Sequence, residues 1–542
     1  MSKKENNNTL VKNATFLMVA ALISKIIGML YKSPLTTLIG RESFACFQFA
    51  QNAYFILLMI ASFSIPQAVS KIMSERIAFK RYRDAQRVFK GALLYAVIAG
   101  GIAALICIFG ASILVPDNMA NARLALQMLA PTIFVSGILG VFRGYFQAYR
   151  NMLPTSISQI LEQIAVATVA LLASGFMVSH FANAGEDTLQ RWSAAGATMG
   201  TGAGVCTAFL FMLFVYKVNH KTIAKKIKND RVSVDESYRS IMKIILLIAA
   251  PIILSAFIYN VNGYINGVMY TSILGWRGVS NSLVKQNYAE YGFFMTLINI
   301  PLTLASTAPT SMMPEVSAQY AIGDLEETKR KIDQATWIAM LISIPASVGL
   351  AVLAQPVTRL IFPSTEGVAG QLMMIGVITV ILNSTSNISN GVLQAIGKAN
   401  IPMINAAIAL GVDVVFLALM LVFTNMGIYA VVLAMVVYAL VMCVLNDRAL
   451  KKYLGYKNPW KSAYFVPILA SIPMGIVAVI VYKLVYAVIG SNFISLIPSI
   501  VFAMIVYFVG YLAVAKPKKE DLAAFPGGTR LAQVAQKLKI LK

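Results

Sequence analysis

The sequence contains few of the residues on which most enzyme and metal chemistry depends. Its 542 residues include 2 histidines and 4 cysteines, and the cysteines have no paired spacing. These counts argue against a histidine-based catalytic triad, a metal cluster and a disulfide framework. The nearest string to a nucleotide-binding loop, residues 391–399, lacks the Ser or Thr that would hold magnesium. We therefore expect no enzyme activity, no metal and no resident cofactor.

Charged residues are also scarce, at 12% of the chain against about 25% in a typical soluble domain. Hydrophobic residues make up 58%, the mean hydropathy is +0.72, and long apolar runs recur from end to end. The longest polar stretch, residues 217–239, is too short for a soluble domain. We therefore expect an all-α polytopic membrane protein. About fourteen spans are predicted, at residues 11–40, 44–70, 88–113, 124–147, 153–180, 193–216, 241–270, 286–313, 333–354, 368–395, 401–423, 426–446, 462–486 and 491–515.

The formal net charge of +23 comes from a one-sided distribution of basic residues. When alternate loops are assigned to one side of the membrane, that side collects about 36 of the 45 lysines and arginines. Such asymmetry is typical of cytoplasmic loops, so both termini are predicted to be cytoplasmic. Topology and anionic lipid headgroups thus explain the excess charge, and no nucleic-acid partner is expected. The first apolar run is too long for a cleaved signal, so we expect it to remain as a span.

The chain contains an internal repeat. Residues 144–154 (GYFQA, then Arg and Pro) and 391–402 (GVLQA, then Lys and Pro) both predict a helix end, a basic turn and a new helix. A weaker match pairs Val69-Ser70 with Val316-Ser317. The copies lie six predicted spans apart, an even number, so both would have the same orientation, as in transporters whose site lies between two halves. Chance similarity of helix-turn chemistry is the alternative.

The repeat leads to a division of the chain into five parts. The basic tail contains an amphipathic stripe, which predicts an interfacial helix or a helix that binds a partner. The predicted parts are an N-terminal lobe at 1–216, a cytoplasmic linker with an interfacial helix at 217–240, a C-terminal lobe at 241–446, two extra spans at 447–516 and the basic cytoplasmic tail at 517–542.

The first predicted span carries Lys25 and Lys32 in its middle. A charged group at bilayer depth costs about 2.5–3.5 kcal/mol on insertion scales, so it calls for a function or a partner. Their spacing projects both lysines from one helical face, where Ser24 and Gly28 leave the surface narrow and open. We interpret this face as the lining of a water-filled cavity that receives an anion. Snorkelling to an interface, or pairing with an acid, is the alternative.

Other polar side chains occur at helical spacing inside the predicted spans. Several such stripes together with the lysines favour a hydrated path, although hydrogen bonding between helices is the commoner use of such residues in membranes. The predicted lining comprises Ser24, Gly28, Gln48, Gln51, Asn52, Asn262, Asn266 and Asn387.

Three acids lie deep enough to be candidates for ion coupling, namely Glu162, Glu290 and Asp413. Each is a candidate partner for a lysine or ligand for a coupling cation, Na⁺ or H⁺. A purely structural pair, for instance Glu162 with a lysine of the first span, is the alternative.

The segments 24–35 (SKIIGMLYKSPL), 39–40 (IG), 47–48 (FQ) and 65–75 (IPQAVSKIMSE) resemble a known family. They are similar to the Gram-positive branch of polysaccharide exporters, which includes the stage V sporulation protein B proteins and MurJ-type lipid II flippases. That branch belongs to the multidrug/oligosaccharidyl-lipid/polysaccharide exporter superfamily. The resemblance implies two six-helix lobes in a V, a central cationic cavity for a lipid pyrophosphate, and a hydrophobic groove beside the last two spans for the polyprenyl tail.

The resemblance can be carried over at some positions and not at others. Lys25 matches the first span-one arginine of the MurJ pattern, and Tyr31-Lys32 is closer to the Tyr-Arg of the Gram-positive branch. An arginine pair of MurJ in the second span is replaced by apolar residues near Leu57 and Leu58. In the eighth span the sequence from Tyr288 to Tyr291 keeps the acid of the MurJ motif and loses its arginine. The exporter assignment is therefore firmer than the choice of lipid II as substrate.

The sequence thus predicts a flippase that moves an undecaprenyl-pyrophosphate-linked saccharide, with lipid II as the first candidate, across the plasma membrane of a Gram-positive bacterium. Lys25 and Lys32 would bind the diphosphate, and an ion or the membrane potential would supply the energy. The expected partners are that substrate and membrane lipids, for a monomer that contacts cell-wall synthesis proteins. The alternatives are a cation-coupled drug exporter of the same fold and a structural scaffold for wall synthesis or sporulation.

Overall fold

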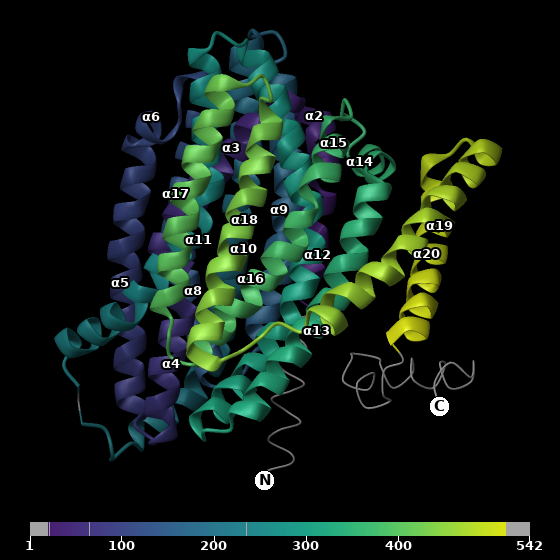
Figure 1. The fold of residues 1–542 in the computed structure, drawn as a ribbon. Helices are drawn as coiled ribbons and strands as arrows, with labels where there is room; N and C mark the ends of the chain where they lie inside the picture. Colours follow the sequence, from purple (N-terminus) through teal and green to yellow (C-terminus); the bar gives the residue numbers. More distant parts are fainter. Residues whose placement is uncertain (1–19, 21, 64, 235, 516–542) are drawn as a thin grey trace. The chain divides into compact units, whose positions relative to one another are not determined.

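The computed structural model describes residues 20, 22–63, 65–234 and 236–515. These residues form helices joined by turns, with no β-strand among them, and Figure 1 labels the helices. The chain forms two compact units, residues 1–289 and 290–542. Their boundary lies within α12 (Asn281–Ala321), so this helix contributes to both units. The all-α fold expected from the composition is confirmed.

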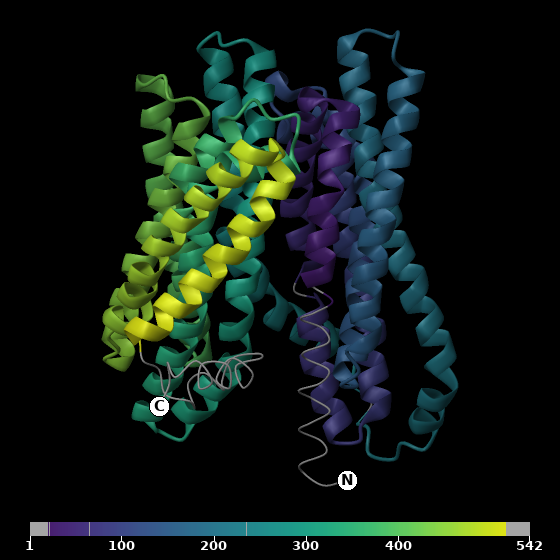
Figure 2. The same ribbon diagram turned by 90° about the vertical axis from the view of Figure 1, so that its right-hand side faces the viewer.

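The N-terminal unit starts with a helical segment at residues 22–30, which continues through Tyr31 into α2. The long helices α9 and α10 pack against each other, and α2 packs against α9 (Figure 2). The helices of this unit are α2 (Lys32–Ile39), α3 (Arg41–Leu58), the π-helical turn η1 (Met59–Phe63), α4 (Ile65–Ala78), α5 (Tyr82–Phe109), α6 (Ala111–Leu114), the 3₁₀ turn η2 (Asp117–Met119), α7 (Ala122–Met128), α8 (Ala130–Ala148), α9 (Leu153–His180), α10 (Glu186–Lys228), α11 (Tyr238–Trp276) and the first part of α12.

The C-terminal unit contains the rest of α12 and the helices that follow it. Its last two helices, α19 and α20, pack along each other as a hairpin. The helices of this unit are α13 (Leu325–Val352), α14 (Ala354–Ile361), α15 (Val368–Gly376), α16 (Ile378–Ala395), α17 (Asn400–Phe423), α18 (Ile428–Leu454), the π-helical turn η3 (Trp460–Phe465), α19 (Val466–Ile489) and α20 (Asn492–Ala515).

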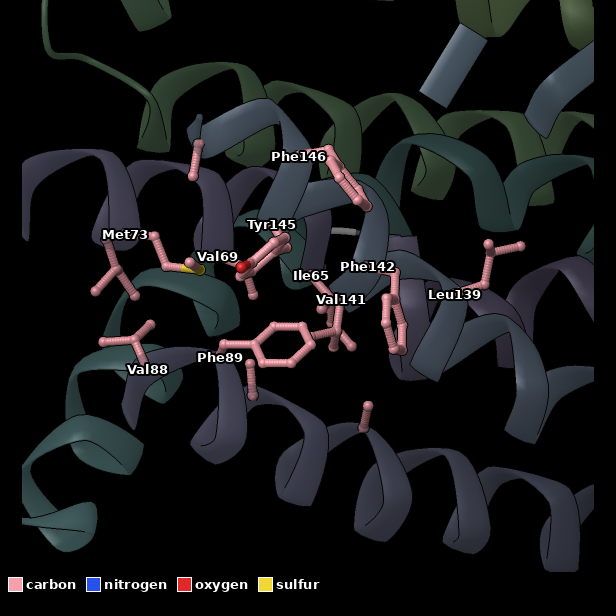
Figure 3. Packing of buried hydrophobic residues seen from close by; sticks show 14 of the residues in the cluster. Ile65, Val69, Met73, Val88, Phe89, Leu139, Val141, Phe142, Tyr145 and Phe146 are labelled. Carbon is pink, nitrogen blue, oxygen red and sulfur yellow. The ribbon is translucent and has the colours of Figure 1, made fainter. Parts of the chain in front are cut away.

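A buried hydrophobic cluster holds the predicted cytoplasmic half of the N-terminal unit together (Figure 3). The ring of Phe89 on α5 packs against Phe142 and Tyr145 on α8, with centroid separations of 5.4 and 4.7 Å. The ring of Tyr216 on α10 stacks on Phe89 at 5.4 Å. Because each aromatic pair contributes about 0.5–1.5 kcal/mol beyond the burial of area, this cluster fixes α5, α8 and α10 as one body.

The repeat found in the sequence has a structural counterpart within each unit. A Cβ atom on Gly144 of α8 would lie 2.7 Å from the carbonyl oxygen of Pro66 on α4. A Cβ atom on Gly391 of α16 would lie 2.9 Å from the sulfur of Met313 on α12. Met313 follows Pro66, and Gly391 follows Gly144, at the same interval along the chain. In each unit a glycine therefore allows close contact between the helix that starts the repeat and its neighbour, which is α4 for α8 and α12 for α16. A turn and a new helix follow the glycine-bearing helix in both units.

Nine described helical segments are long and apolar enough to cross a membrane, and ten if the bent pair α15–α16 counts as one span. The other four predicted spans coincide with the segment ending in α2, with α3–α4, with α11 and with α12. The count of fourteen stays a prediction, as does the five-part division of the chain. In the predicted linker, residues 217–228 continue α10 rather than starting a helix of their own. The predicted tail helix lies outside the described residues.

Candidate functional site

Lys25 and Lys32 lie on the helical segment that leads into α2. The Lys25 side chain is exposed and the Lys32 side chain is half-buried. Among the described residues, no ion pair of Lys25 with a carboxylate is present, and snorkelling or pairing stays the alternative to a cavity lining. Both lysines thus lie in helical segments, and their shared face and role in binding an anion stay predictions.

Gly28 lies between the two lysines and sets how closely this segment approaches α9. A Cβ atom on Gly28 would lie 2.9 Å from Oε1 of Gln163 on α9. The hydroxyl oxygen of Ser24 is buried and has no hydrogen-bond partner within the described part of the chain. The lysine face therefore borders a close helix contact that carries polar groups, rather than a fully open surface.

The stripe on α3 hydrogen-bonds to neighbouring helices of the N-terminal unit. Gln51 donates through Nε2 to Oγ1 of Thr201 on α10 at 2.7 Å. Asn52 donates through Nδ2 to the hydroxyl of Tyr288 on α12 at 3.0 Å, and Gln48 donates to Oδ1 of Asn52 at 3.5 Å. These contacts are of the kind that joins helices in membranes. Cavity lining by these side chains stays a prediction.

The stripe on α11 is more deeply buried than the stripe on α3. Asn266 is fully buried and donates through Nδ2 to Oδ1 of Asn262, which is 8% exposed, at 3.3 Å. In the C-terminal unit, Asn387 on α16 is exposed. Three other asparagines form a hydrogen-bonded chain between α16, α17 and α18. Asn405 donates to Asn446 at 2.8 Å, and Asn446 donates to Asn390 at 2.7 Å.

Glu162 pairs with an arginine of the neighbouring helix α8. Arg143 on α8 lies 2.7 Å from a carboxylate oxygen of Glu162 on α9, and its Nε donates to Ser158 at 3.1 Å. The structural pairing considered for Glu162 therefore exists, but its partner is Arg143 and not a lysine of the first span. The sequence did not indicate this partner, because the contact depends on how α8 packs on α9. Arg143 lies in α8 more than a turn before its end, where its side chain reaches Glu162.

Glu290 is buried and anchors a helix start in the C-terminal unit. Its carboxylate accepts hydrogen bonds from the Thr365 hydroxyl at 2.6 Å and from the backbone N–H groups of Glu366 and Ala369, each at 2.8 Å. Ala369 lies in the first turn of α15, where the helix dipole stabilises a negative charge. These contacts describe a carboxylate that fixes a loop and a helix end. A role for Glu290 in coupling stays a prediction.

Asp413 lies in the middle of α17 and is fully buried. It shares the buried side of that helix with Asn405. A carboxylate at 0% exposure inside an apolar helix bundle needs compensation for its lost hydration. A role for Asp413 in binding a coupling ion stays a prediction.

Sequence reasoning missed a polar network at the predicted external end of the N-terminal unit. Glu42 of α3 accepts hydrogen bonds from Ser282 and, at 3.1 Å, from Gln286 on α12. Gln190 of α10 donates to Glu42 at 2.9 Å and accepts from the buried ammonium of Lys285 at 2.7 Å. The residues come from three distant segments, so no local pattern could have grouped them. The network ties the start of α12 to α3 and α10.

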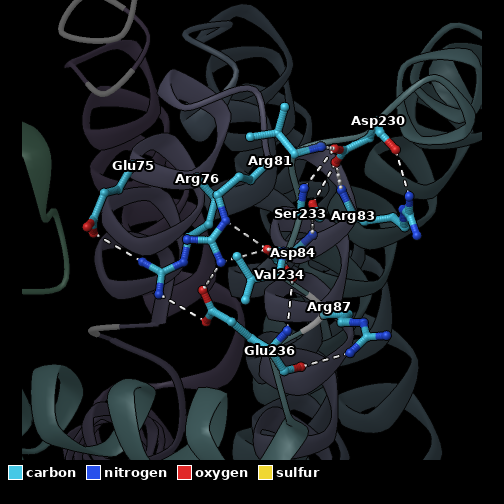
Figure 4. A network of polar contacts seen from close by, with 11 residues as sticks. Glu75, Arg76, Arg81, Arg83, Asp84, Arg87, Asp230, Ser233, Val234 and Glu236 are labelled. Atoms are coloured by element: carbon cyan, nitrogen blue, oxygen red, sulfur yellow. Dashed lines mark hydrogen bonds and ion pairs between the residues drawn. The ribbon is translucent and has the colours of Figure 1, made fainter.

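A second network, which we call the linker clamp, fixes residues 230–234 and Glu236 against the end of α4 and the start of α5 (Figure 4). The carboxylate of Asp84 is fully buried and accepts from the backbone N–H groups of Val234 at 3.0 Å and Glu236 at 3.1 Å. The Glu236 carboxylate in turn pairs with Arg76 at 3.1 Å and Arg81 at 2.6 Å. Val234 and Glu236 are therefore held by charged side chains close to the start of α11.

Asp230 forms the other end of the linker clamp. Burial raises the pKa of its carboxyl, but hydrogen bonds from the Ser233 hydroxyl and from the backbone N–H groups of Arg83, Val232 and Ser233 outweigh burial and hold the pKa well below its usual range. The backbone N–H of Arg83 donates to Asp230 at 2.7 Å. Asp230 therefore stabilises this end of the clamp in its ionised form.

The described residues contain no group of three or more His, Cys, Asp or Glu side chains that could hold a metal ion.

Comparison with known proteins places the chain in a family. A family model described as "Polysaccharide biosynthesis protein" matches residues 10–319, and a model described as "MatE" matches residues 279–419. Stage V sporulation protein B of Bacillus subtilis (strain 168) is 24% identical over 457 residues, which cover 82% of this chain and 84% of that protein. Lipid II flippase MurJ of the same organism is 23% identical over 427 residues, covering 76% of this chain and 77% of that protein.

Solved structures show the same fold. An inward-facing multidrug resistance MATE family transporter of the MOP superfamily has a TM-score of 0.62 at 15% identity and covers 82% of this chain and 98% of its own. The inward closed conformation of lipid II flippase MurJ has a TM-score of 0.60 at 14% identity and covers 91% of this chain and 97% of its own. The resemblance seen in the sequence is thereby confirmed. The chain is a multi-pass membrane protein with the fold of MOP-superfamily transporters, and it belongs to the polysaccharide biosynthesis protein family.

Proposed function

We propose that the protein is a flippase that moves an undecaprenyl-pyrophosphate-linked saccharide from the inner to the outer leaflet of the plasma membrane, with lipid II as the first substrate to test. The observation that carries this proposal is the pair Lys25 and Lys32 on one face of a helix inside an apolar segment. The relatives named as a lipid II flippase and a sporulation protein support the same substrate class.

The lysine pair suits a diphosphate because of its charge and its spacing. The two Cα atoms lie about 10 Å apart along the helix, at 1.5 Å per residue, and each lysine has a flexible four-carbon stem. Both ammonium groups can therefore reach one diphosphate. Binding this anion would offset the cost of about 2.5–3.5 kcal/mol for each charge at bilayer depth.

Alternating access requires contacts that close the transport path on one side of the membrane in one state and break in the other state. We assign the network of Glu42, Gln190, Ser282, Lys285 and Gln286 to this role at the predicted external end of the N-terminal unit. It consists of hydrogen bonds between side chains, each involving the Glu42 carboxylate or the Lys285 ammonium. Each such bond contributes about 1.5–3 kcal/mol. Such a closure can open reversibly.

We propose that Asp413 couples transport to an ion. Its full burial in α17 favours binding of a proton or Na⁺, and a bound cation shifts the balance between two states by its difference in affinity for them. The membrane potential supplies about 2.3 kcal/mol per charge per 100 mV. No nucleotide is required in this scheme.

A cation-coupled drug exporter is the second candidate, and the MATE family structures among the neighbours favour it. It predicts that a carboxylate, and not the lysine pair, decides substrate binding. A structural scaffold for wall synthesis, the third possibility, predicts that neutralising the lysines has no effect.

One experiment separates these candidates. The chain is expressed in cells in which the resident lipid II flippase can be depleted, and growth is measured after depletion. The proposal predicts that the chain restores growth. Failure to restore growth by a protein that reaches the membrane would contradict lipid II as the substrate, and a gain of drug resistance in the same cells would support the exporter.

A further inference from the structure

A groove of about 830 Å³ lies between α5 and α11 in the N-terminal unit. At its floor, a Cβ atom on Gly91 of α5 would lie 3.0 Å from the Ile241 side chain of α11, so the missing side chain allows the two helices to approach closely. The lining residues are Gly91 and Leu94 from α5, and Tyr238, Arg239, Met242, Lys243, Leu246, Leu247 and Ala250 from α11.

The lining of the groove changes from charged to apolar along α11. Arg239 and Lys243 lie in its first two turns, while the later lining residues are apolar. Both cations are exposed, and neither forms an ion pair with another described residue. The end of the groove with these cations also lies at the N-terminus of α11, which favours an anion through the helix dipole. This end lies next to the linker, on the predicted cytoplasmic side.

The apolar end of the groove faces outward. Leu94, Leu246 and Leu247 are 51%, 45% and 65% exposed in the structure, so a bilayer would supply their surroundings. From Arg239 to Ala250 the groove extends about 16 Å along the helix. This length matches about half of the 30 Å hydrocarbon core, which is the depth of one leaflet.

We propose that this groove is a binding site for one anionic phospholipid of the inner leaflet. Its phosphate contacts Arg239 and Lys243, and one acyl chain lies along Leu94, Leu246 and Leu247. Basic pockets between helices on the cytoplasmic side are suited to anionic headgroups, and the apolar continuation fits an acyl chain. The site differs from the lysine face of α2 in its elements and its residues, and it does not depend on the transported substrate.

The test uses native mass spectrometry of the full-length protein with equal amounts of phosphatidylglycerol and phosphatidylcholine. The wild type is expected to retain one phosphatidylglycerol in preference to phosphatidylcholine. Changing Arg239 and Lys243 together to Gln should weaken this preference about 25-fold, since each cation near the membrane surface contributes about five-fold. The matched control changes Lys457 and Lys461 to Gln, because these exposed lysines have the same spacing and lie on the same predicted side.

A second variant separates a groove from general attraction to a basic surface. Ala250→Trp fills the apolar end and leaves both cations in place, so it should also reduce retention of phosphatidylglycerol. Unchanged retention in Ala250→Trp, or in the double Gln variant, would overturn the proposal. Dimers of the wild type that retain no lipid and are lost in both variants would also overturn it, because they would show that a second copy occupies the groove.

Discussion

At the scale of residues, the positive charge on Lys25 and Lys32 is the property on which the proposed transport depends. We predict that Lys25→Ala and Lys32→Ala each abolish growth of cells that rely on this chain for lipid II export. Arginine at either position should retain part of the activity, because the charge persists. Membrane levels measured on the same cells separate loss of transport from loss of protein. Full growth with both alanine variants would refute the cationic face.

The second residue-level prediction concerns Asp413. Its counterpart in the first copy of the repeat, in α9, is apolar, so a shared packing requirement does not explain this acid. Asp413→Asn should remove or shift the ion dependence of transport and leave binding of the lipid substrate nearly unchanged. Transport is measured while sodium, pH and membrane potential are varied one at a time. If the variant keeps the dependence of the wild type on all three, the carboxylate is structural.

Single residues also show where sequence reasoning failed. The spacing of Lys25 and Lys32 could be predicted from helical periodicity alone, and the structure keeps both in helical segments. The partner of Glu162 could not be predicted, because the contact with Arg143 depends on how α8 packs on α9. For the same reason the Glu290 contacts with the start of α15 were missed, since they join segments far apart in the chain.

At the scale of elements, the repeated helix contact gives a sharp stability prediction. Gly144→Ala places a methyl group 2.7 Å from the backbone oxygen of Pro66, which cannot move without shifting α4. We expect a destabilisation of about 1–3 kcal/mol, the usual range for overpacking. Gly391→Ala should cost less, since its neighbour is the flexible side chain of Met313. Gly101→Ala is the control, with nothing within 4 Å of its added Cβ. Thermal unfolding in detergent measures all three, and equal losses would contradict the packing argument.

The linker clamp gives a prediction about pH. The folded-state pKa of Asp230 is lowered, so its stabilising effect is present above the unfolded value of about 4 and is lost as the pH falls through the folded value. The protection of the backbone N–H groups of residues 230–234 and 236 against hydrogen exchange, relative to the intrinsic rate at each pH, should therefore fall as the solution becomes strongly acidic. Asp230→Asn should cause the same loosening at neutral pH, whereas the exposed Glu326→Gln should not. Hydrogen exchange that is identical in the wild type and Asp230→Asn would show that the carboxylate does not hold the linker.

At the scale of the whole molecule, the distribution of charge predicts the topology. In a variant without native cysteines, single cysteines near Arg83, Lys228 and Lys457 should resist an impermeant thiol reagent in intact cells. Cysteines near Asp117, Glu186 and Arg277 should react. Labelling of the Lys228 position from outside would reverse the assignment of the linker and of both networks to their sides of the membrane.

The helical class and the family could be predicted because they depend on composition, apolar runs and local motifs, all of which are properties of the sequence itself. The internal repeat could also be found, since Gly144 and Gly391 each precede a similar turn. The linker clamp and the network around Glu42 could not, because long-range packing decides which polar groups meet. Residues 217–228 form the end of α10, and their predicted position at the membrane surface stays a prediction.

The central claim is that this chain carries a lipid diphosphate across a membrane. The most direct measurement uses vesicles containing purified protein and labelled lipid II, with a membrane potential imposed and the externally accessible fraction of label followed over time. The account predicts transfer by the wild type above that of protein-free vesicles, and transfer at the protein-free rate for the Lys25→Ala/Lys32→Ala double variant. Equal transfer by the wild type and the double variant, or no transfer by the wild type, would contradict it.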